Sequence, residues 1–262
     1  MTNPFDDVIE ATRRRGYHNH RQAEHSTLLS EGILRDLRGR CPRIDEDLTS
    51  GNVRAWTDRH LPAPRGVRER GRLVDLLIGP AIAGTDRPSP DFRICIEHKS
   101  VITAHRNARA RFGDLNEVLE VAHLGRPDAV LVATLLLGVS ERYLNVADRI
   151  KSFVPGWEKS VLPALSTGDQ TLWTRYPAAV SSNGPDDAAK TLAIFRELPL
   201  RDYRRTHLKG YDFRLAVPVD MDNVNPPRVA RSNSLNIDVD AEYDAMIDTI
   251  CRAYSARWPS RD

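Results

Sequence analysis

Two carboxylates and a lysine stand in two neighbouring apolar segments of the chain. Asp75 interrupts the run RLVDLLIG (72 to 79), and Glu97 and Lys99 stand near the end of DFRICIEHKS (91 to 100). A lone carboxylate is costly to bury in an apolar strand unless it is paired or binds a metal. Carboxylate oxygens suit Mg²⁺, which joins one or two carboxylates to the phosphate of a substrate. A neighbouring lysine can position the attacking water and offset the charge of the phosphate, so these residue types favour phosphodiester hydrolysis.

Alternation along the second segment decides which of its side chains work together. Side chains alternate in a strand, so Glu97 and Lys99 lie on one face, about 6 to 7 Å apart along the strand. His98 points to the other face, so only its main-chain carbonyl can reach the same site. The alternative is a plain salt bridge from Asp75 or Glu97 to Lys99 inside the sheet. Buried ion pairs contribute little to stability, so the three groups together favour a functional site.

Hydrophobic periodicity predicts the elements that position these residues. We expect a helix over 23 to 38, a loop over 39 to 71 with at most a short strand at 53 to 56, antiparallel strands at 72 to 79 and 91 to 100, a helix over 103 to 123 and a buried strand over 128 to 138. The second helix is then a crossover to a strand parallel to 91 to 100. Beyond this core we expect helices at 186 to 198 and 240 to 257 and a strand at 212 to 219. The predicted fold class is α/β (α+β), a mixed central β-sheet flanked by helices, in a single domain over 1 to 262.

Composition is that of a globular protein. The 262 residues are 40% hydrophobic and 28% charged, and no run approaches the roughly eighteen apolar residues of a membrane span. The N-terminal segment lacks the apolar core of a signal peptide. Three scattered cysteines, Cys41, Cys95 and Cys251, do not suggest a disulfide framework. We therefore expect a cytoplasmic protein with reduced thiols and no membrane partner.

A basic stretch follows the charged strand end. From His98 to Gly113 the chain carries four cations and no acidic residue. A local basic surface points to a polyanion more strongly than the net charge of +2 does. Arginine and asparagine hold phosphates and read base edges in the major groove. The candidate DNA-binding residues are Ser100, His105, Arg106, Asn107, Arg109, Arg111 and Asn116.

Two polar stretches, 181 to 187 and 222 to 234, are expected to be loops that are too polar to pack. The second carries Arg228 and Arg231 and could form an arm over a ligand. The alternative is an ordinary solvated loop.

The order of motif and elements resembles the core of the PD-(D/E)xK nuclease superfamily, which includes many type II restriction endonucleases. The resemblance rests on Asp75, on Glu97-His98-Lys99 at the end of the next strand, and on the helix and buried strand that follow. It covers roughly residues 23 to 138, and it departs from the pattern at Val74, where the superfamily motif has proline. It implies a restriction-endonuclease-like core in which Asp75 and Glu97 ligate Mg²⁺, the main-chain carbonyl of His98 is a further metal ligand, and Lys99 is catalytic.

Members of this superfamily often place a further glutamate on a helix before the strands. Glu31 is the candidate for that catalytic role. Its alternative is an ordinary exposed glutamate that pairs with Arg35 four residues later.

The resemblance implies a Mg²⁺-dependent endonuclease that cuts double-stranded DNA, most simply a type II restriction enzyme. About half of the chain, 139 to 262, is left for sheet completion, DNA recognition and dimer contacts. Cutting both strands requires two active sites, so a homodimer is the economical arrangement. The alternatives are a structure-specific repair, junction-resolving or transposon-related nuclease and a non-catalytic DNA-binding protein. The intact set of two carboxylates and a lysine speaks against the last.

Overall fold

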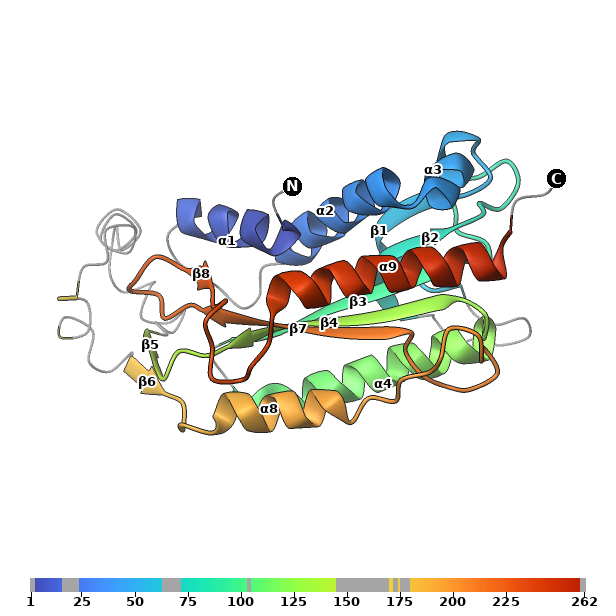
Figure 1. Cartoon of the computed structure of the whole chain (residues 1–262). Coiled ribbons are helices and arrows are strands. Elements are labelled where there is room, and N and C mark those ends of the chain that lie inside the picture. Colours follow the sequence, from blue (N-terminus) through green and yellow to red (C-terminus); the bar gives the residue numbers. More distant parts are fainter. Residues whose placement is uncertain are drawn as a thin grey trace.

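Helices cover both faces of a mixed β-sheet in the computed structural model of the chain (Figure 1). The structure describes residues 3–15, 24–62, 72–102, 105–144, 170–171, 174 and 180–259. The sheet has six strands in the order β1-β2-β3-β4-β7-β8. Their bounds are β1 (Arg54–His60), β2 (Leu73–Gly79), β3 (Ile94–Val101), β4 (Val130–Gly138), β7 (Phe213–Asp220) and β8 (Arg228–Val229).

Strand directions confirm the predicted topology. The neighbours β2 and β3 are antiparallel, and β3 runs parallel to β4 after a helical crossover. Strand β4 is also parallel to β7, while β1 and β8 add antiparallel edges. The sheet is therefore mixed and flanked by helices, which confirms the predicted α+β class.

Two helical layers enclose the sheet. One layer holds α1 (Pro4–Arg15), α2 (Glu24–Arg40), α3 (Pro42–Thr49) and α9 (Val239–Arg257), and the other holds α4 (Ala108–Gly125) and α8 (Asp187–Arg196) (Figure 1). A short 3-10 turn, η1 (His105–Asn107), leads into α4. A small ribbon of β5 (Arg142–Leu144) and β6 (Val180–Ser182) lies at one end of the molecule. Among the described residues, no helix combines the length and the apolar character needed to cross a bilayer.

The two layers explain the apolar character of the central strands. Strand β4, VLVATLLLG, is buried along its whole length because helices cover both of its faces. Helix α4 turns Leu115, Leu119 and Ala122 to the core. This packing fixes β3, and with it the charged residues near its end.

The prediction of a loop over 39 to 71 is wrong for its first half. Residues 42 to 49 form α3, and β1 runs for seven residues rather than the expected four at most. Strand β1 lies at the edge of the sheet and reads RAWTDRH, with four exposed side chains. Charge on an edge strand prevents edge-to-edge association and also hides the alternation on which strand prediction depends.

The stretch 222 to 234 packs, contrary to expectation. Asp222, Asn223 and Val224 are buried. The Asp222 carboxylate accepts hydrogen bonds from the backbone N–H of Val224 and of Asn225, both at 2.7 Å. Polar side chains of this type satisfy the turn's own backbone, so polarity here marks a turn and not solvation.

The thiols also differ from expectation. Cys41, at the start of α3, and Cys251, in α9, form a disulfide with their Cα atoms 5.2 Å apart. The prediction of reduced thiols is wrong for this pair, because folding brings together two cysteines that are 210 residues apart in the sequence. Cys95 is free and buried.

Candidate active site

The strands β2 and β3 separate at Asp75. Their pairing covers residues 76 to 78 against 94 to 96. Beyond that point, the Asp75 carboxylate replaces the backbone partner and accepts a hydrogen bond from the N–H of His98 at 2.6 Å. In a strand, the N–H and C=O of one residue point to the same neighbour, so the His98 carbonyl also faces this gap.

Glu97 and Lys99 lie on the same face of the sheet, as alternation predicts. Their side chains form an ion pair and are almost buried, with 4% and 17% of their surface exposed. The second carboxylate oxygen of Glu97, Oε2, is buried and has no hydrogen-bond partner among the described residues. An unpaired buried carboxylate oxygen is costly, so this atom marks a place where a further ligand would be stabilising.

The electrostatics of the site are those of two carboxylates held close together. Burial raises the pKa of Glu97 to about 7, the negative charge of Asp75 adds to the rise, and Lys99 opposes it. The carboxyl of Glu97 therefore changes its charge near neutral pH. Two neighbouring carboxylates do not readily ionise together because their negative charges repel, and a bound cation would offset this repulsion.

The His98 side chain points to the opposite face, as predicted, and both of its ring nitrogens contact hydroxyl groups there. Its Nδ1 lies 2.7 Å from the hydroxyl of Thr134 in β4, and its Nε2 lies 3.1 Å from the hydroxyl of Ser30 in α2. Ser30 in turn donates to the main-chain carbonyl of Asp75 at 3.1 Å. Burial lowers the pKa of His98. A neutral His98 ring accepts a hydrogen bond from Thr134 and donates one to Ser30. Each donor and acceptor in this series of hydrogen bonds then has a partner, and the series holds the Asp75 backbone in place.

Sequence reasoning missed Ser30 and Thr134. Nothing in the sequence separates Ser30 from the other hydroxyl residues of its helix, because its role arises from packing of α2 on the strands. A single serine on a helix carries no periodic signal that would point to such a contact. The polar Thr134 inside the apolar strand β4 is the one signal that could have directed attention to the His98 ring.

Glu31 makes no described hydrogen bond or ion pair with Asp75 or Glu97. It is exposed on α2, where its neighbour Ser30 is the residue that reaches the strands. Within the described ranges, no group of three or more His, Cys, Asp or Glu side chains is suited to hold a metal. The expected pair of Glu31 with Arg35 is not seen either, because Arg35 contacts Asp7 and Asp36.

Asp58 of β1 has an unusual backbone next to the site. Its φ is 50°, in the left-handed region, and it lies between the pairs Thr57↔Leu76 and Arg59↔Val74, level with Asp75. Its carboxylate accepts a hydrogen bond from Thr27 of α2 at 3.3 Å. Non-glycine residues with positive φ often occur beside functional sites.

The candidate DNA-binding residues follow β3 but differ in exposure. Arg106, Asn107 and Arg109 are exposed at the start of α4, while Ser100, Arg111 and Asn116 are half-buried. His105 is buried and its Nδ1 lies 2.8 Å from the Thr191 hydroxyl. Arg111 pairs with Asp114. The fold therefore brings three exposed polar residues, and not the whole set, to one surface.

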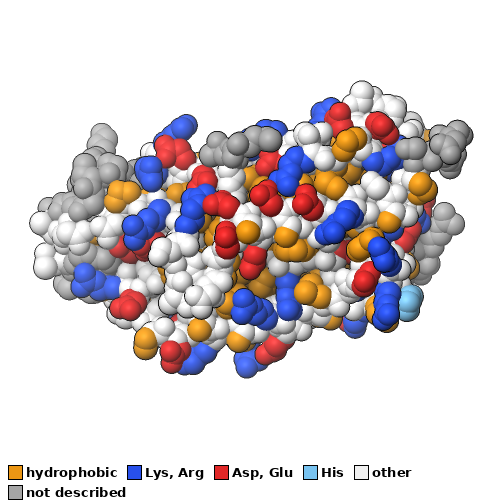
Figure 2. All heavy atoms as spheres, viewed as in Figure 1, with side chains coloured by type: hydrophobic (Ala, Val, Ile, Leu, Met, Phe, Trp, Pro, Cys, Tyr) orange, Lys and Arg blue, Asp and Glu red, His pale blue; other side chains and the backbone are white. Residues whose placement is uncertain are grey.

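Most arginines elsewhere are neutralised by carboxylates. Figure 2 shows acidic and basic side chains interspersed on the face that carries α9. On that side Arg40 pairs with Asp244 and Asp248. Ion pairs also hold the two arginines of the suspected arm: Arg231 binds Asp6 and Asp240, and Arg228 binds Asp220. The arm arginines are thus bound within the chain.

Comparisons of the chain with protein-family models, with curated proteins and with solved structures found no significant match.

Proposed function

We propose that this protein is a Mg²⁺-dependent endonuclease of the PD-(D/E)xK class that hydrolyses phosphodiester bonds in double-stranded DNA, most simply as a type II restriction enzyme. One observation carries the proposal. Asp75, Glu97 and Lys99 lie together where β2 and β3 separate, and an oxygen of Glu97 is buried there with no hydrogen-bond partner in the described part of the chain.

The donor set fits Mg²⁺. The carboxylates of Asp75 and Glu97 and the main-chain carbonyl of His98, which faces the same gap, are hard oxygen ligands. When bound, Mg²⁺ would acidify a water molecule and neutralise charge on the phosphate. Two carboxylates leave room for the waters and the phosphate oxygens that this cation retains.

Lys99 and Glu97 have different roles in the proposed reaction. Their side chains pair with each other. A bound phosphate would offer Lys99 a second acceptor, so its ammonium can donate to a phosphate oxygen or to the attacking water. Because the pKa of Glu97 is about 7, this carboxyl must lose its proton before it can serve as a ligand. Activity is therefore expected to rise with pH through neutrality.

The proposed partner is duplex DNA bound by a homodimer in the cytoplasm. The exposed residues Arg106, Asn107 and Arg109, at the end of β3 that carries the site, suit contacts to the backbone or to base edges. Two copies of one site, related by a twofold axis, would cut the two strands of a palindrome. A structure-specific nuclease with the same core is the alternative, and it would not cut plain duplex into discrete bands.

The test is cleavage of unmethylated and methylated genomic DNA with Mg²⁺, followed by sequencing of the ends. Wild type should give ends at one recurring sequence, and Glu97→Gln and Lys99→Ala should lose at least about a thousandfold in rate. Glu10→Gln, which changes an exposed carboxylate on α1, is the matched control and should cut like wild type. Thermal melting would verify that each variant folds. No cleavage with any divalent metal, or equal cleavage by Lys99→Ala, would contradict the proposal.

A further inference from the structure

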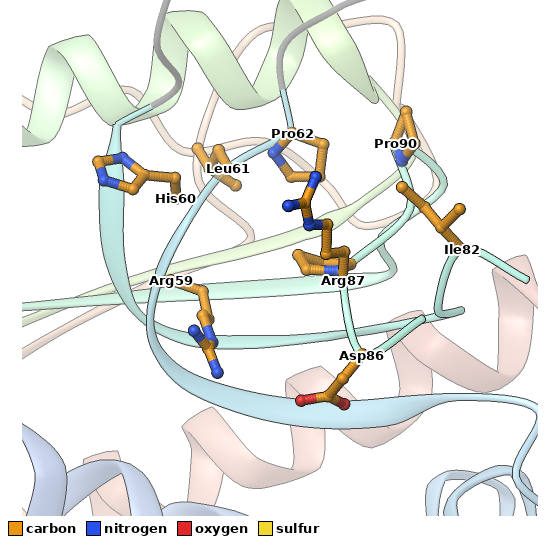
Figure 3. Close-up of a pocket in the computed structure, with 9 residues that line it drawn as sticks. Arg59, His60, Leu61, Pro62, Ile82, Asp86, Arg87 and Pro90 are labelled. Carbon is orange, nitrogen blue, oxygen red and sulfur yellow. The ribbon is translucent and has the colours of Figure 1, made fainter. Parts of the chain in front are cut away.

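A cavity of about 500 Å³ lies at the edge of the sheet, beside the end of β1 (Figure 3). Its walls come from the end of β1, from the two residues after it and from the connection between β2 and β3. The lining residues are Arg59, His60, Leu61, Pro62, Ile82, Asp86, Arg87, Pro88 and Pro90. The volume is within the range of small-molecule sites.

Backbone hydrogen bonds hold these walls in place. Leu61 N–H donates to the Arg72 carbonyl at 2.7 Å, and Ile82 N–H donates to the Arg87 carbonyl at 2.8 Å. Ala81 and Pro88 form a β-bridge across the connection. The proline rings in the lining add stiffness, so the cavity is preformed and does not need to be ordered by a ligand.

The charge of the cavity is positive because its acid is already bound. The carboxylate of Asp86 accepts from Arg54 at 3.2 Å and from the indole N–H of Trp56 at 3.4 Å. Neither Arg59 nor Arg87 has a side-chain hydrogen bond or ion pair with any described residue, unlike Arg54 on the same strand. Two guanidinium groups with no partner among the residues that the structure describes, beside a neutralised carboxylate, favour an anion.

The cavity also has an apolar wall. Ile82 is 44% exposed, and prolines lie beside it in the lining of the cavity. A ligand that matches both walls carries a phosphate and a flat, less polar body. A nucleotide unit has this composition, and the planar guanidinium group of an arginine can donate two hydrogen bonds to its phosphate.

The cavity lies near the candidate active site. Arg59 pairs with Val74, the residue before Asp75, so both features are at the same end of the sheet. Where β2 and β3 are still paired, the backbones of β1 and β3 are two strand spacings apart, about 10 Å. Each DNA strand carries a phosphate about every 3.4 Å of helix axis, so a strand cut at Asp75 would pass the cavity within a few nucleotides.

We propose that this cavity is a subsite for one nucleotide of the DNA strand flanking the scissile phosphate, a reading that rests on the proposed nuclease function. Arg59 and Arg87 bind its phosphate, and Ile82 and the neighbouring prolines contact its sugar and base.

The test is the affinity of the full-length protein for a fluorescent DNA duplex in EDTA, where binding is measured without metal-dependent cleavage. Arg59→Ala/Arg87→Ala should bind about tenfold more weakly near 0.1 M salt, and the slope of log Kd against log salt should fall by about 0.9, the contribution of the one phosphate contact that both arginines share. Ile82→Ala should lose a few-fold in affinity with an unchanged slope, because it removes apolar contact and no charge.

The matched control is Arg14→Ala/Arg38→Ala, which removes two exposed arginines that are paired with Glu10 and Asp45. Its affinity should stay within about twofold of wild type. An unchanged slope in Arg59→Ala/Arg87→Ala, or an equal loss in the control, would overturn the subsite while leaving cleavage by wild type as evidence for the nuclease. A wild-type protein that binds no duplex would overturn the subsite and count against the proposed function as well.

Discussion

Buried carboxylates occur in two kinds of surroundings in this protein. Asp212, at the start of β7, accepts from the Leu131 N–H at 2.9 Å and from Arg201 at 2.9 Å, and Arg257 binds both of its oxygens. Every oxygen is therefore satisfied. Glu97 pairs with Lys99 through one oxygen only, and its other oxygen has no hydrogen-bond partner among the described residues.

The pKa values show the same contrast. Burial alone would raise the pKa of Asp47, but hydrogen bonds from Asn52 and Tyr254 and the charges of Arg93 and Arg43 outweigh it and hold the pKa below its ordinary value. Burial of Glu97 is not compensated in this way, so its pKa is raised to about 7. The ion-pair clusters around Asp212 and Asp47 are complete, and the pair of carboxylates at the splayed strands is incomplete. An incomplete buried site is expected where a ligand supplies what is missing.

The largest effect should come from the complete cluster. Asp212→Ala leaves the fully buried guanidinium of Arg201 without its carboxylate, and the free energy of unfolding should fall by about 3 to 5 kcal/mol. Urea unfolding would measure it. Asp45→Ala, which breaks the exposed pair with Arg38, should cost less than about 1 kcal/mol. Equal losses in the two variants would show that the cluster around Asp212 is not structural.

The contribution of Glu97 to the free energy of unfolding should fall as the pH rises, whereas the contribution of a carboxylate in an ordinary ion pair rises with pH. The pKa of Glu97 in the folded protein, about 7, lies above its ordinary 4.5, so the folded state binds this proton more tightly. The stabilisation is complete below about pH 4.5 and is lost as the pH rises through 7. In metal-free buffer, wild type should therefore lose up to about 3 kcal/mol relative to Glu97→Gln between pH 5 and pH 8 or so. Unfolding curves of the two proteins that stay parallel over this range would contradict the shifted pKa.

A smaller effect is expected at the far side of β3. Ser30→Ala removes the hydroxyl that links His98 to the Asp75 carbonyl and should cost about 1 kcal/mol of stability. If the Asp75 carboxylate is a ligand, the Mg²⁺ concentration for half-maximal cleavage should rise about tenfold while the maximal rate changes little. Ser232→Ala, at an exposed serine, is the control and should change neither value. A fall in maximal rate with an unchanged Mg²⁺ requirement would assign Ser30 a different role.

The smallest effect should come from Glu31. It is exposed and makes no described contact with the two carboxylates, so Glu31→Gln should change the free energy of unfolding by less than about 0.5 kcal/mol and the cleavage rate by less than about threefold. A large loss of rate without loss of stability would return Glu31 to the site.

The part of the fold that the sequence predicts is the part with strong periodicity. The strands β2, β3 and β4 and the helix α4 each carry an apolar pattern of one period, and their order with the right-handed crossover limits the topology to few choices. The edge strand β1 was predicted too short and the short helix α3 was missed, because charged side chains break their patterns.

The candidate site was predictable only along single strands. Alternation gives the common face of Glu97 and Lys99, and the separation of β2 from β3 follows from no local rule. The contacts of His98 with Ser30 and Thr134 join three elements. The cavity likewise combines the end of β1 with the β2–β3 connection. Such contacts depend on tertiary packing, which a periodic pattern does not contain.

The most direct test of the incomplete carboxylate site is metal binding without DNA. Mn²⁺, which takes the same oxygen ligands as Mg²⁺, can be counted by electron paramagnetic resonance in solutions of wild type, Glu97→Gln and the control Glu10→Gln. We predict about one bound Mn²⁺ per wild-type and control chain and at least a tenfold weaker affinity for Glu97→Gln. Equal Mn²⁺ binding by all three proteins, or none by wild type, would contradict a metal site at Asp75 and Glu97.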